Sequence, residues 1–212
     1  MSLSIYFLRH GETEHSKTGG YCGALDVELT DIGVQMAEAF AAEYDQHPWT
    51  AIYCSPMKRT RATVKPLCDR TGLQPEFRDG LKELQYGQWE DKTPAVLQQE
   101  FASDYVRWLT EPAWNPPTGG ETATEVASRA QLVITEIKEK YPDGNVLVVS
   151  HKTTIRVIIC SLLGIDLGRY RDRIEMPVAS VSIVKFDVHG PMLRCLADRS
   201  HFPPELRNLP GT

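Results

Sequence analysis

The sequence predicts an α/β fold of three layers, in which a mostly parallel sheet carries helices on both faces. Short apolar segments typical of buried strands alternate along the chain with segments whose apolar residues recur at helical spacing. One of these strands, Val146–Ser150, is almost entirely β-branched or leucine, which indicates burial on both faces. The chain has 212 residues, of which 42% are hydrophobic, and this is enough for a large core.

The first half of the chain predicts three strands and two helices in alternation. Thr30 is suited to cap the first helix. Ser55-Pro56 is expected to end a strand and open the second helix, since proline is favoured in a first helical turn. The elements are expected at Ser4–Leu8 (strand), about Asp31–Tyr44 (helix), Trp49–Cys54 (strand), Pro56 to about Cys68 (helix) and Glu76–Arg78 (short strand).

The second half opens with a less regular segment, from about residue 79 to residue 120. It holds three of the four tryptophans, is interrupted by prolines and lacks a strong core pattern of its own. We therefore expect one domain over residues 1–212, in which this segment is an insertion that covers a site. The other elements are expected as helices at Ala95–Phe101, Asp104–Leu109, Thr122–Tyr141 and Thr154–Leu163, strands at Val146–Ser150, Val181–Phe186 and Met192–Ala197, and an extended tail over the last twelve residues.

Charge and cysteine content narrow the class of protein. The formal net charge of −5 argues against nucleic acid or an anionic membrane surface as a partner. The first residues lack the charged-then-apolar pattern of a leader, so we expect none, and no apolar run approaches membrane-spanning length. The five cysteines are widely spaced and form no CxxC pair, which indicates free thiols in a reducing compartment. We expect a cytoplasmic enzyme with a small-molecule substrate.

Two buried strands each end on a histidine. His10 follows the first strand directly after Arg9, and His151 follows Val146–Ser150. Because parallel strands share a carboxyl edge, where open α/β sheets bind ligands, both imidazoles are expected to meet there. One such histidine alone is most often a loop residue facing solvent, but two at one edge favour a functional site.

Other hydrolytic sites lack their motifs in this chain. The six histidines show neither HxH nor HExxH spacing, so we expect no metal. There is no GxxxxGK[ST] loop and no GxSxG elbow. We expect no cofactor.

Five short motifs follow one another over nearly the whole chain. They are Leu8-Arg9-His10-Gly11-Glu12-Thr13, Ser55-Pro56-Met57-Lys58-Arg59-Thr60, Leu81-Lys82-Glu83-Leu84 with Tyr86-Gly87-Gln88-Trp89-Glu90, Gly119-Gly120-Glu121-Thr122, and Val148-Val149-Ser150-His151. In order and separation they resemble the histidine phosphatase superfamily, which includes cofactor-dependent phosphoglycerate mutases and fructose-2,6-bisphosphatases. The resemblance implies a phosphoglycerate mutase-like fold and phosphoryl-transfer chemistry.

A phosphate monoester is a dianion, and a neutral imidazole can attack it without repulsion to form a labile phosphohistidine. The resemblance supports His10 as this nucleophile, and its other ring nitrogen should then donate to a fixed acceptor such as a local carbonyl. Arg9 and Arg59 carry planar donors suited to phosphate, and a protonated His151 is expected to complete the phosphate site. Arg59 taken alone would be a surface salt-bridge residue.

The leaving alkoxide needs a proton. The resemblance assigns general acid and base catalysis to Glu83, with a pKa that nearby phosphate charge is expected to raise. Glu12, Glu90 and Glu121 are competitors, and helix capping is the alternative role of Glu121.

Four further positions are expected to bind phosphate or substrate. Ser16 stands where many relatives have asparagine, and Cys22 where they have a small hydroxyl residue. Gly23 keeps its match, and its backbone N–H is expected to contact phosphate. Lys152 stands where relatives have glycine and is a candidate specificity residue, with a solvent-directed side chain as the alternative.

The choice within the family is between phosphatase and mutase. The mutases carry paired arginines in a larger insertion, whereas residues 92–115 contain Arg107 alone. The segment from Tyr86 to Glu90 resembles the phosphatase branch, and we expect Tyr86 and Trp89 in the pocket wall. We therefore expect hydrolysis of a small phosphate monoester through phosphohistidine, without metal. Mutase activity is the alternative. A catalytically inactive binding protein is disfavoured because the five expected catalytic residues are all present. The closing strands are compatible with a homodimer or a monomer.

Overall fold

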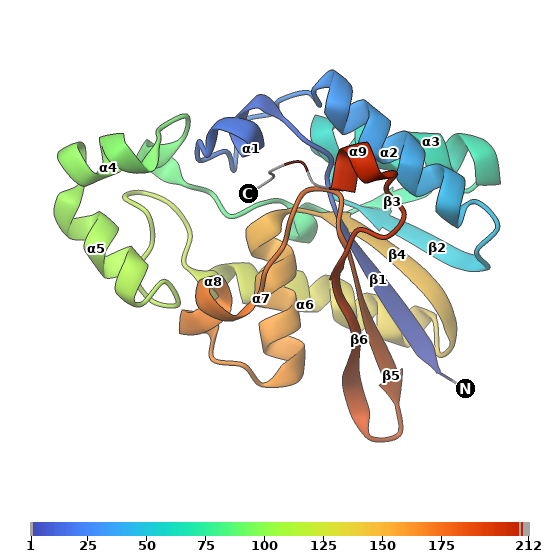
Figure 1. Ribbon diagram of the computed structural model, residues 1–212. Helices are drawn as coiled ribbons and strands as arrows, with labels where there is room; N and C mark the ends of the chain where they lie inside the picture. The colour runs from blue at the N-terminus through green and yellow to red at the C-terminus, as the bar shows by residue number, and fades with distance from the viewer. Residues whose placement is uncertain (1, 208, 210–212) are drawn as a thin grey trace.

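A six-stranded sheet forms the centre of the computed structural model, which describes residues 2–207 and 209. The strand order is β3-β2-β4-β1-β5-β6 (Figure 1). The first four of these strands run parallel, and β5 and β6 are antiparallel to their neighbours. This confirms the predicted mostly parallel sheet. The strands are β1 Leu3–Arg9, β2 Trp49–Cys54, β3 Pro75–Phe77, β4 Gly144–Ser150, β5 Val181–Asp187 and β6 Gly190–Asp198.

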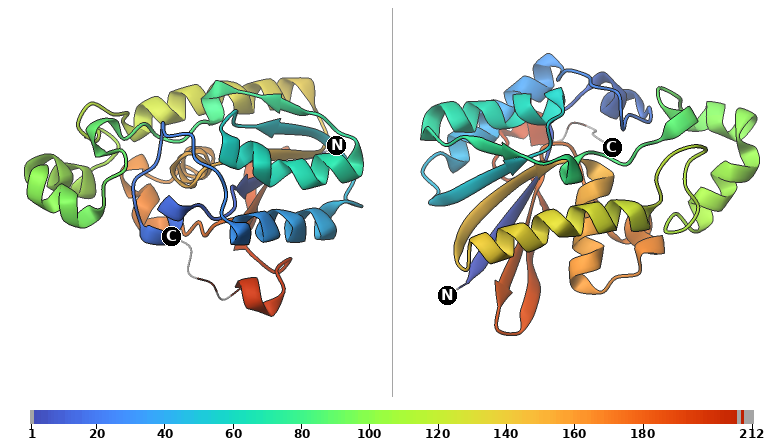
Figure 2. Two further views of the ribbon diagram at one scale, coloured as in Figure 1. Left: turned by 90° about the horizontal axis from the view of Figure 1, so that it is seen from above. Right: turned by 180° about the vertical axis from the view of Figure 1, so that it is seen from behind.

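Helices cover both faces of the sheet. The long helices α2 and α3 lie on one face, and α6 and α7 lie on the other (Figures 1 and 2). The helices are α1 Glu14–Thr18, α2 Asp31–Tyr44, α3 Lys58–Thr71, α4 Pro94–Glu100, α5 Ala102–Thr110, α6 Ala123–Lys140, α7 Lys152–Leu163, α8 Tyr170–Arg173 and α9 Pro204–Arg207, with 3₁₀ turns η1 Asp79–Leu81, η2 Gly87–Trp89 and η3 Leu167–Arg169.

The alternation of strand side chains divides the core in two. Phe7 and Val148 join the core cluster on the α6 and α7 face, and their chain neighbours Leu8 and Val149 join the cluster on the α2 and α3 face. All four are fully buried. A strand buried on both faces reads as a continuous apolar run, which is the pattern seen in β4.

Several helix starts differ from the prediction, and three of them bear on the site. Helix α3 begins at Lys58, so Ser55-Pro56 lies in the turn before the helix and not within it. Helix α7 begins at Lys152, directly after His151, because the chain turns into helix as soon as β4 ends. Helix α6 is capped by Thr122 in a capping box with Glu125, so capping is not the role of Glu121.

The tail prediction is wrong in part. Residues 204–207 form α9, which Pro204 opens, and its Leu206 is buried together with Phe202 in the cluster under α2. Burial of these two side chains stabilises a helix too short to form by itself. Residues 208 and 210–212 lie outside the described residues.

The segment from 79 to 120 forms η1, η2, α4 and α5, and Figure 1 shows α4 and α5 beside the sheet as a separate lobe. Its aromatic side chains pack on one another: the Trp89 ring centroid lies 5.6 Å from that of Tyr105 and 5.5 Å from that of Trp108. These residues belong to the same cluster as the core under α6 and α7. Within the described part of the chain, no helix is long and apolar enough to cross a bilayer.

Candidate active site

The two histidines meet at the carboxyl edge of the sheet, as the shared strand direction predicts. The backbone N–H of His10 donates to the Ser150 carbonyl at 3.0 Å, which ties the end of β1 to the end of β4. The rings of His10 and His151 lie with centroids 5.3 Å apart. Both residues are buried.

A cavity of about 270 Å³ opens at this edge. Its volume suits a small metabolite. Seven of the nine catalytic and binding residues expected from the sequence line it: Arg9, His10, Ser16, Cys22, Arg59, Glu83 and Lys152. Neither His151 nor Gly23 belongs to this lining, although the fully buried His151 ring lies against His10.

The proton on His10 is placed by the backbone. Its Nδ1 lies 2.8 Å from the Gly11 carbonyl oxygen, and a carbonyl can only accept, so Nδ1 carries the hydrogen. Burial and the positive charges of Arg9 and Arg59 hold the pKa of His10 well below its ordinary value. The neutral ring therefore presents an unprotonated Nε2, as the sequence argument requires of a nucleophile. Gly11 makes this turn possible, since a Cβ there would lie 2.6 Å from the Gly33 carbonyl oxygen.

His151 differs from the expected protonated form. Its Nδ1 accepts a hydrogen bond from Arg59 Nε at 3.1 Å, so the single ring proton lies on Nε2, which donates to Ser55 Oγ at 2.8 Å. Burial, together with the charge of Arg59, holds the pKa of His151 well below its ordinary value. A neutral imidazole fixed by two neighbours is the result.

Arg59 holds a loop as well as a histidine. Besides its bond to His151, it donates to the carbonyls of Leu25 at 2.7 Å and of Gly23 at 3.0 Å. The expected contact of the Gly23 N–H with phosphate is wrong, because that N–H donates to the Glu90 carboxylate at 3.0 Å. Glu90 thus fixes this loop and does not compete with Glu83 as the acid.

Arg9 has one buried hydrogen-bond donor without a partner among the described residues. Its Nη1 donates to the Met176 carbonyl at 2.6 Å, while its Nε is buried and has no hydrogen-bond partner among the described residues. A buried N–H of a guanidinium without an acceptor is costly, and an anion in the cavity would relieve that cost.

The carboxylate of Glu83 lies at the N-terminus of α7. One oxygen accepts from the backbone N–H groups of Leu84 and Thr154, and the other accepts from the N–H of Thr153 at 3.0 Å. The first turn of a helix offers N–H groups without partners and a positive field. These bonds fix the orientation of Glu83 toward the cavity that it lines.

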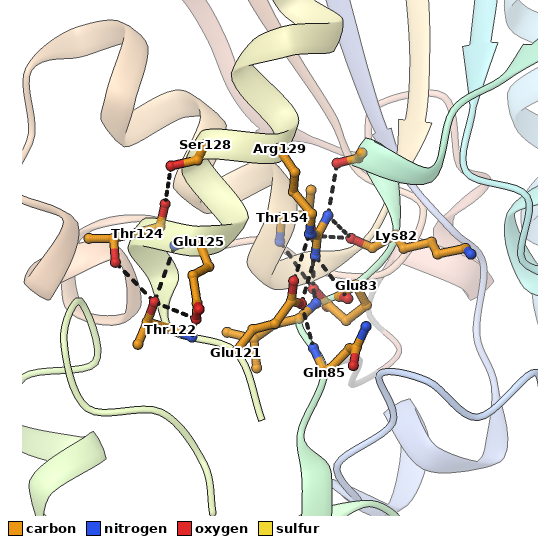
Figure 3. Close-up of polar contacts among 12 residues, drawn as sticks. Lys82, Glu83, Gln85, Glu121, Thr122, Thr124, Glu125, Ser128, Arg129 and Thr154 are labelled. Atoms are coloured by element: carbon orange, nitrogen blue, oxygen red, sulfur yellow. Dashed lines mark hydrogen bonds and ion pairs between the residues drawn. The ribbon is translucent and has the colours of Figure 1, made fainter. Parts of the chain in front are cut away.

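Arg129 on α6 holds the chain on either side of Glu83 (Figure 3). Its guanidinium donates to three backbone carbonyls, those of Gly80, Lys82 and Glu83, and forms a paired contact with the Glu121 carboxylate at 2.9 and 3.0 Å. Glu121 also accepts from the Gln85 N–H. The fourth sequence motif therefore acts through Arg129 as a support for the third.

Replacement of Arg129 is expected to cost stability. Arg129→Lys should lower the free energy of unfolding by about 2–3 kcal/mol, because one ammonium cannot satisfy three carbonyls and a carboxylate arranged around a planar fork. Urea denaturation followed by circular dichroism measures the effect. Wild-type stability of Arg129→Lys would show that the fork geometry does not matter.

The remaining predicted residues differ in their surroundings. Ser16 exchanges hydrogen bonds with Thr13 in the capping box of α1. The Cys22 thiol faces the Leu25 carbonyl, and burial raises its pKa to about 11. Lys152 is half-buried in the cavity wall, so the alternative of a solvent-directed side chain is wrong.

The pocket wall was predicted only in part. Tyr86 lines the cavity, but the prediction for Trp89 is wrong, since it is fully buried in the core. Sequence reasoning missed several lining residues: His15, Pro94, Trp108, Arg156, Tyr170 and Arg171. One signal was available: Arg156 stands four residues after Lys152, on the same helix face.

A neutral imidazole, two guanidinium groups and an oriented carboxylate around a small cavity define an enzyme that acts on an anionic substrate. The chain belongs to the histidine phosphatase superfamily (branch 1), whose family model matches residues 5–199. It is 30% identical over 168 residues to phosphoserine phosphatase 1 of Hydrogenobacter thermophilus, covering 79% of this chain and 80% of that protein.

Other relatives carry different substrate names. An adenosylcobalamin/alpha-ribazole phosphatase of Salmonella typhimurium is 27% identical over 161 residues, covering 76% of this chain and 80% of that protein. Among solved structures, a mycobacterial glucosyl-3-phosphoglycerate phosphatase is 25% identical, with a TM-score of 0.84 over 93% of this chain and 99% of that one. The similarity supports a phosphatase over the mutase alternative.

Proposed function

We propose that this protein is a phosphomonoesterase that hydrolyses a small phosphate monoester through a phosphohistidine on His10, without a metal ion. The observation that carries the proposal is the His10 ring, which has its proton fixed on Nδ1 by Gly11 and lines a cavity beside Arg9. Its Nε2 is thereby the available nucleophile.

In the first step, Nε2 of His10 attacks phosphorus. An N–P bond forms while the bond from phosphorus to the ester oxygen breaks, and Glu83 gives that oxygen a proton. Arg9, which lines the cavity and has an unpartnered Nε, binds the transferring group in this proposal. Arg59 and His151 bind it by giving up hydrogen bonds that they make to the Gly23 carbonyl and to Ser55.

In the second step, water attacks the phosphohistidine. Glu83 takes a proton from the water, the N–P bond breaks, and inorganic phosphate leaves with His10 neutral again. Ser16, Cys22 and Lys152, which line the cavity, are the proposed substrate contacts besides the reacting group.

The segment from 79 to 120 is proposed as an insertion that covers this site within a single domain. Tyr86, Pro94 and Trp108 come from it and line the cavity. The five cysteines are all free, which supports a reducing, cytoplasmic location. The proposed function is compatible with either a monomer or a homodimer.

A panel of phosphate esters with excess chelator tests the proposed function. Turnover of small monoesters is expected to continue at the same rate with chelator, because imidazole and guanidinium groups supply the nucleophile and the charge. With 3-phosphoglycerate and a trace of 2,3-bisphosphoglycerate, phosphate release should exceed formation of 2-phosphoglycerate. Activity lost on chelation, or faster isomerisation than hydrolysis, would overturn the proposal.

A further inference from the structure

Three cationic side chains line the cavity beyond those proposed to bind the reacting phosphoryl group. Lys152 and Arg156 come from α7, and Arg171 comes from α8. Across residues 2–207 and 209, none of the three side chains has a hydrogen-bond acceptor or a carboxylate at ion-pair distance. Among the described residues, the cluster therefore has no negatively charged group paired with it.

The burial of these cations makes the lack of a partner significant. Arg156 Nε and Arg171 Nη1 are shielded from solvent, and a guanidinium stays charged. Burial, aided by the charges of Arg9 and Arg156, lowers the pKa of Lys152 to about 7. Unpaired charge on half-buried side chains with shielded N–H groups is costly, so this arrangement favours an anion in the cavity.

The acidic lining of the cavity does not supply that anion. Glu83 is the one carboxylate that lines it among the described residues. Both of its oxygens already accept N–H groups at the start of α7, from Leu84, Thr153 and Thr154. A ligand is therefore the remaining source of negative charge.

The cations extend away from His10. Lys152 follows His151 directly, and Arg156 lies one turn further on the same face, about 6 Å along the helix axis. The Arg171 guanidinium carbon lies 3.8 Å from the centroid of the Trp108 ring, and Figure 1 shows α8 between α7 and α5. Since Arg156 and Arg171 come from positions further along the chain from His151 than Lys152 does, the cluster extends from the end of β4 along the wall of the cavity.

We infer that Lys152, Arg156 and Arg171 form a second anion subsite, which binds a carboxylate or a second phosphate on the alcohol part of the substrate. The inference rests on the proposed function, since it requires the reacting phosphoryl group at His10. The substrate is then the phosphate ester of a short acidic alcohol, and Tyr86 contributes an aromatic wall beside its carbon chain.

Three esters of one carbon skeleton test this subsite. Glycerol 3-phosphate carries a hydroxymethyl group where 3-phosphoglycerate carries a carboxylate and glycerol 1,3-bisphosphate carries a second phosphate. At least one acidic ester should exceed glycerol 3-phosphate in kcat/KM by about tenfold or more. Which of the two does so distinguishes carboxylate from phosphate. Where turnover is too slow, inhibition constants against p-nitrophenyl phosphate give the same ratio.

Variants assign this preference to the cluster. Arg156→Gln should lower the ratio of acidic to neutral ester by about tenfold. Arg173→Gln removes an exposed charge from α8 and should leave the ratio unchanged. Equal values for all three esters, or an unchanged ratio in Arg156→Gln, would overturn the inference. The proposed function would survive that result, since it is tested separately by the chelator experiment and by the activity of His10→Ala.

Discussion

His10→Ala is expected to lower kcat by about 10⁴-fold or more, the largest effect in this protein. The substitution removes the only group placed to form the covalent intermediate in our proposal. The ring makes one side-chain hydrogen bond, to the Gly11 carbonyl, so the fold should tolerate its loss. Residual activity would come from binding and charge alone.

Quenching in alkali, in which phosphohistidine survives, detects the intermediate directly. Wild-type protein mixed with a ³²P-labelled monoester and denatured in alkali should retain label on histidine, and His10→Ala should retain none. His189→Ala is a matched control, because His189 is exposed in the turn between β5 and β6. Equal labelling of His10→Ala and wild type would place the nucleophile elsewhere.

The sequence predicted the sheet well because its strands are encoded locally. β1 and β4 are apolar runs that end on a histidine, and each matches its predicted range to within two residues at either end. Helix boundaries were less predictable. Proline at position 56 is compatible with a first helical turn and with the turn before it, and only the contacts of the folded chain select the second.

The five proposed catalytic residues could be predicted because each lies within a short motif, several of them at the end of a strand. Bonding partners far away in sequence could not. The N–H of Gly23 finds Glu90 at a separation of 67 residues, and this partner removes it from the expected phosphate contact. Nothing local to Gly23 indicates a carboxylate that comes from residue 90, within the insertion.

The same limit applies to the cavity wall. From the sequence, an aromatic side chain such as Trp89 is equally compatible with a pocket wall and with the core. In the structure, its packing with Tyr105 and Trp108 places it in the core. Arg171 belongs to a four-residue helix with no motif. Its place in the cavity depends on how α8 packs against α7 and α5, which is tertiary information.

Glu83→Gln is expected to lower kcat by about 10²–10⁴-fold for an alkyl phosphate. An alkoxide is a poor leaving group and needs the proton that the amide cannot give. A nitrophenolate leaves without protonation, so p-nitrophenyl phosphate should lose much less in the first step. The contrast between the two leaving groups separates proton donation from structural damage, which would affect both esters alike.

Structural damage has to be considered, since the carboxylate accepts backbone N–H groups at the start of α7. An amide nitrogen in place of one oxygen would face the N–H of Thr153, and Glu83→Gln should therefore also unfold more easily. Glu83→Asp keeps an acid on a shorter side chain and should recover part of the alkyl phosphate activity. Glu38→Gln, which removes an exposed carboxylate on α2, is the control. The first step is measured as the burst of nitrophenolate or of alcohol released after rapid mixing. An equal slowing of both esters in Glu83→Gln would contradict the acid role.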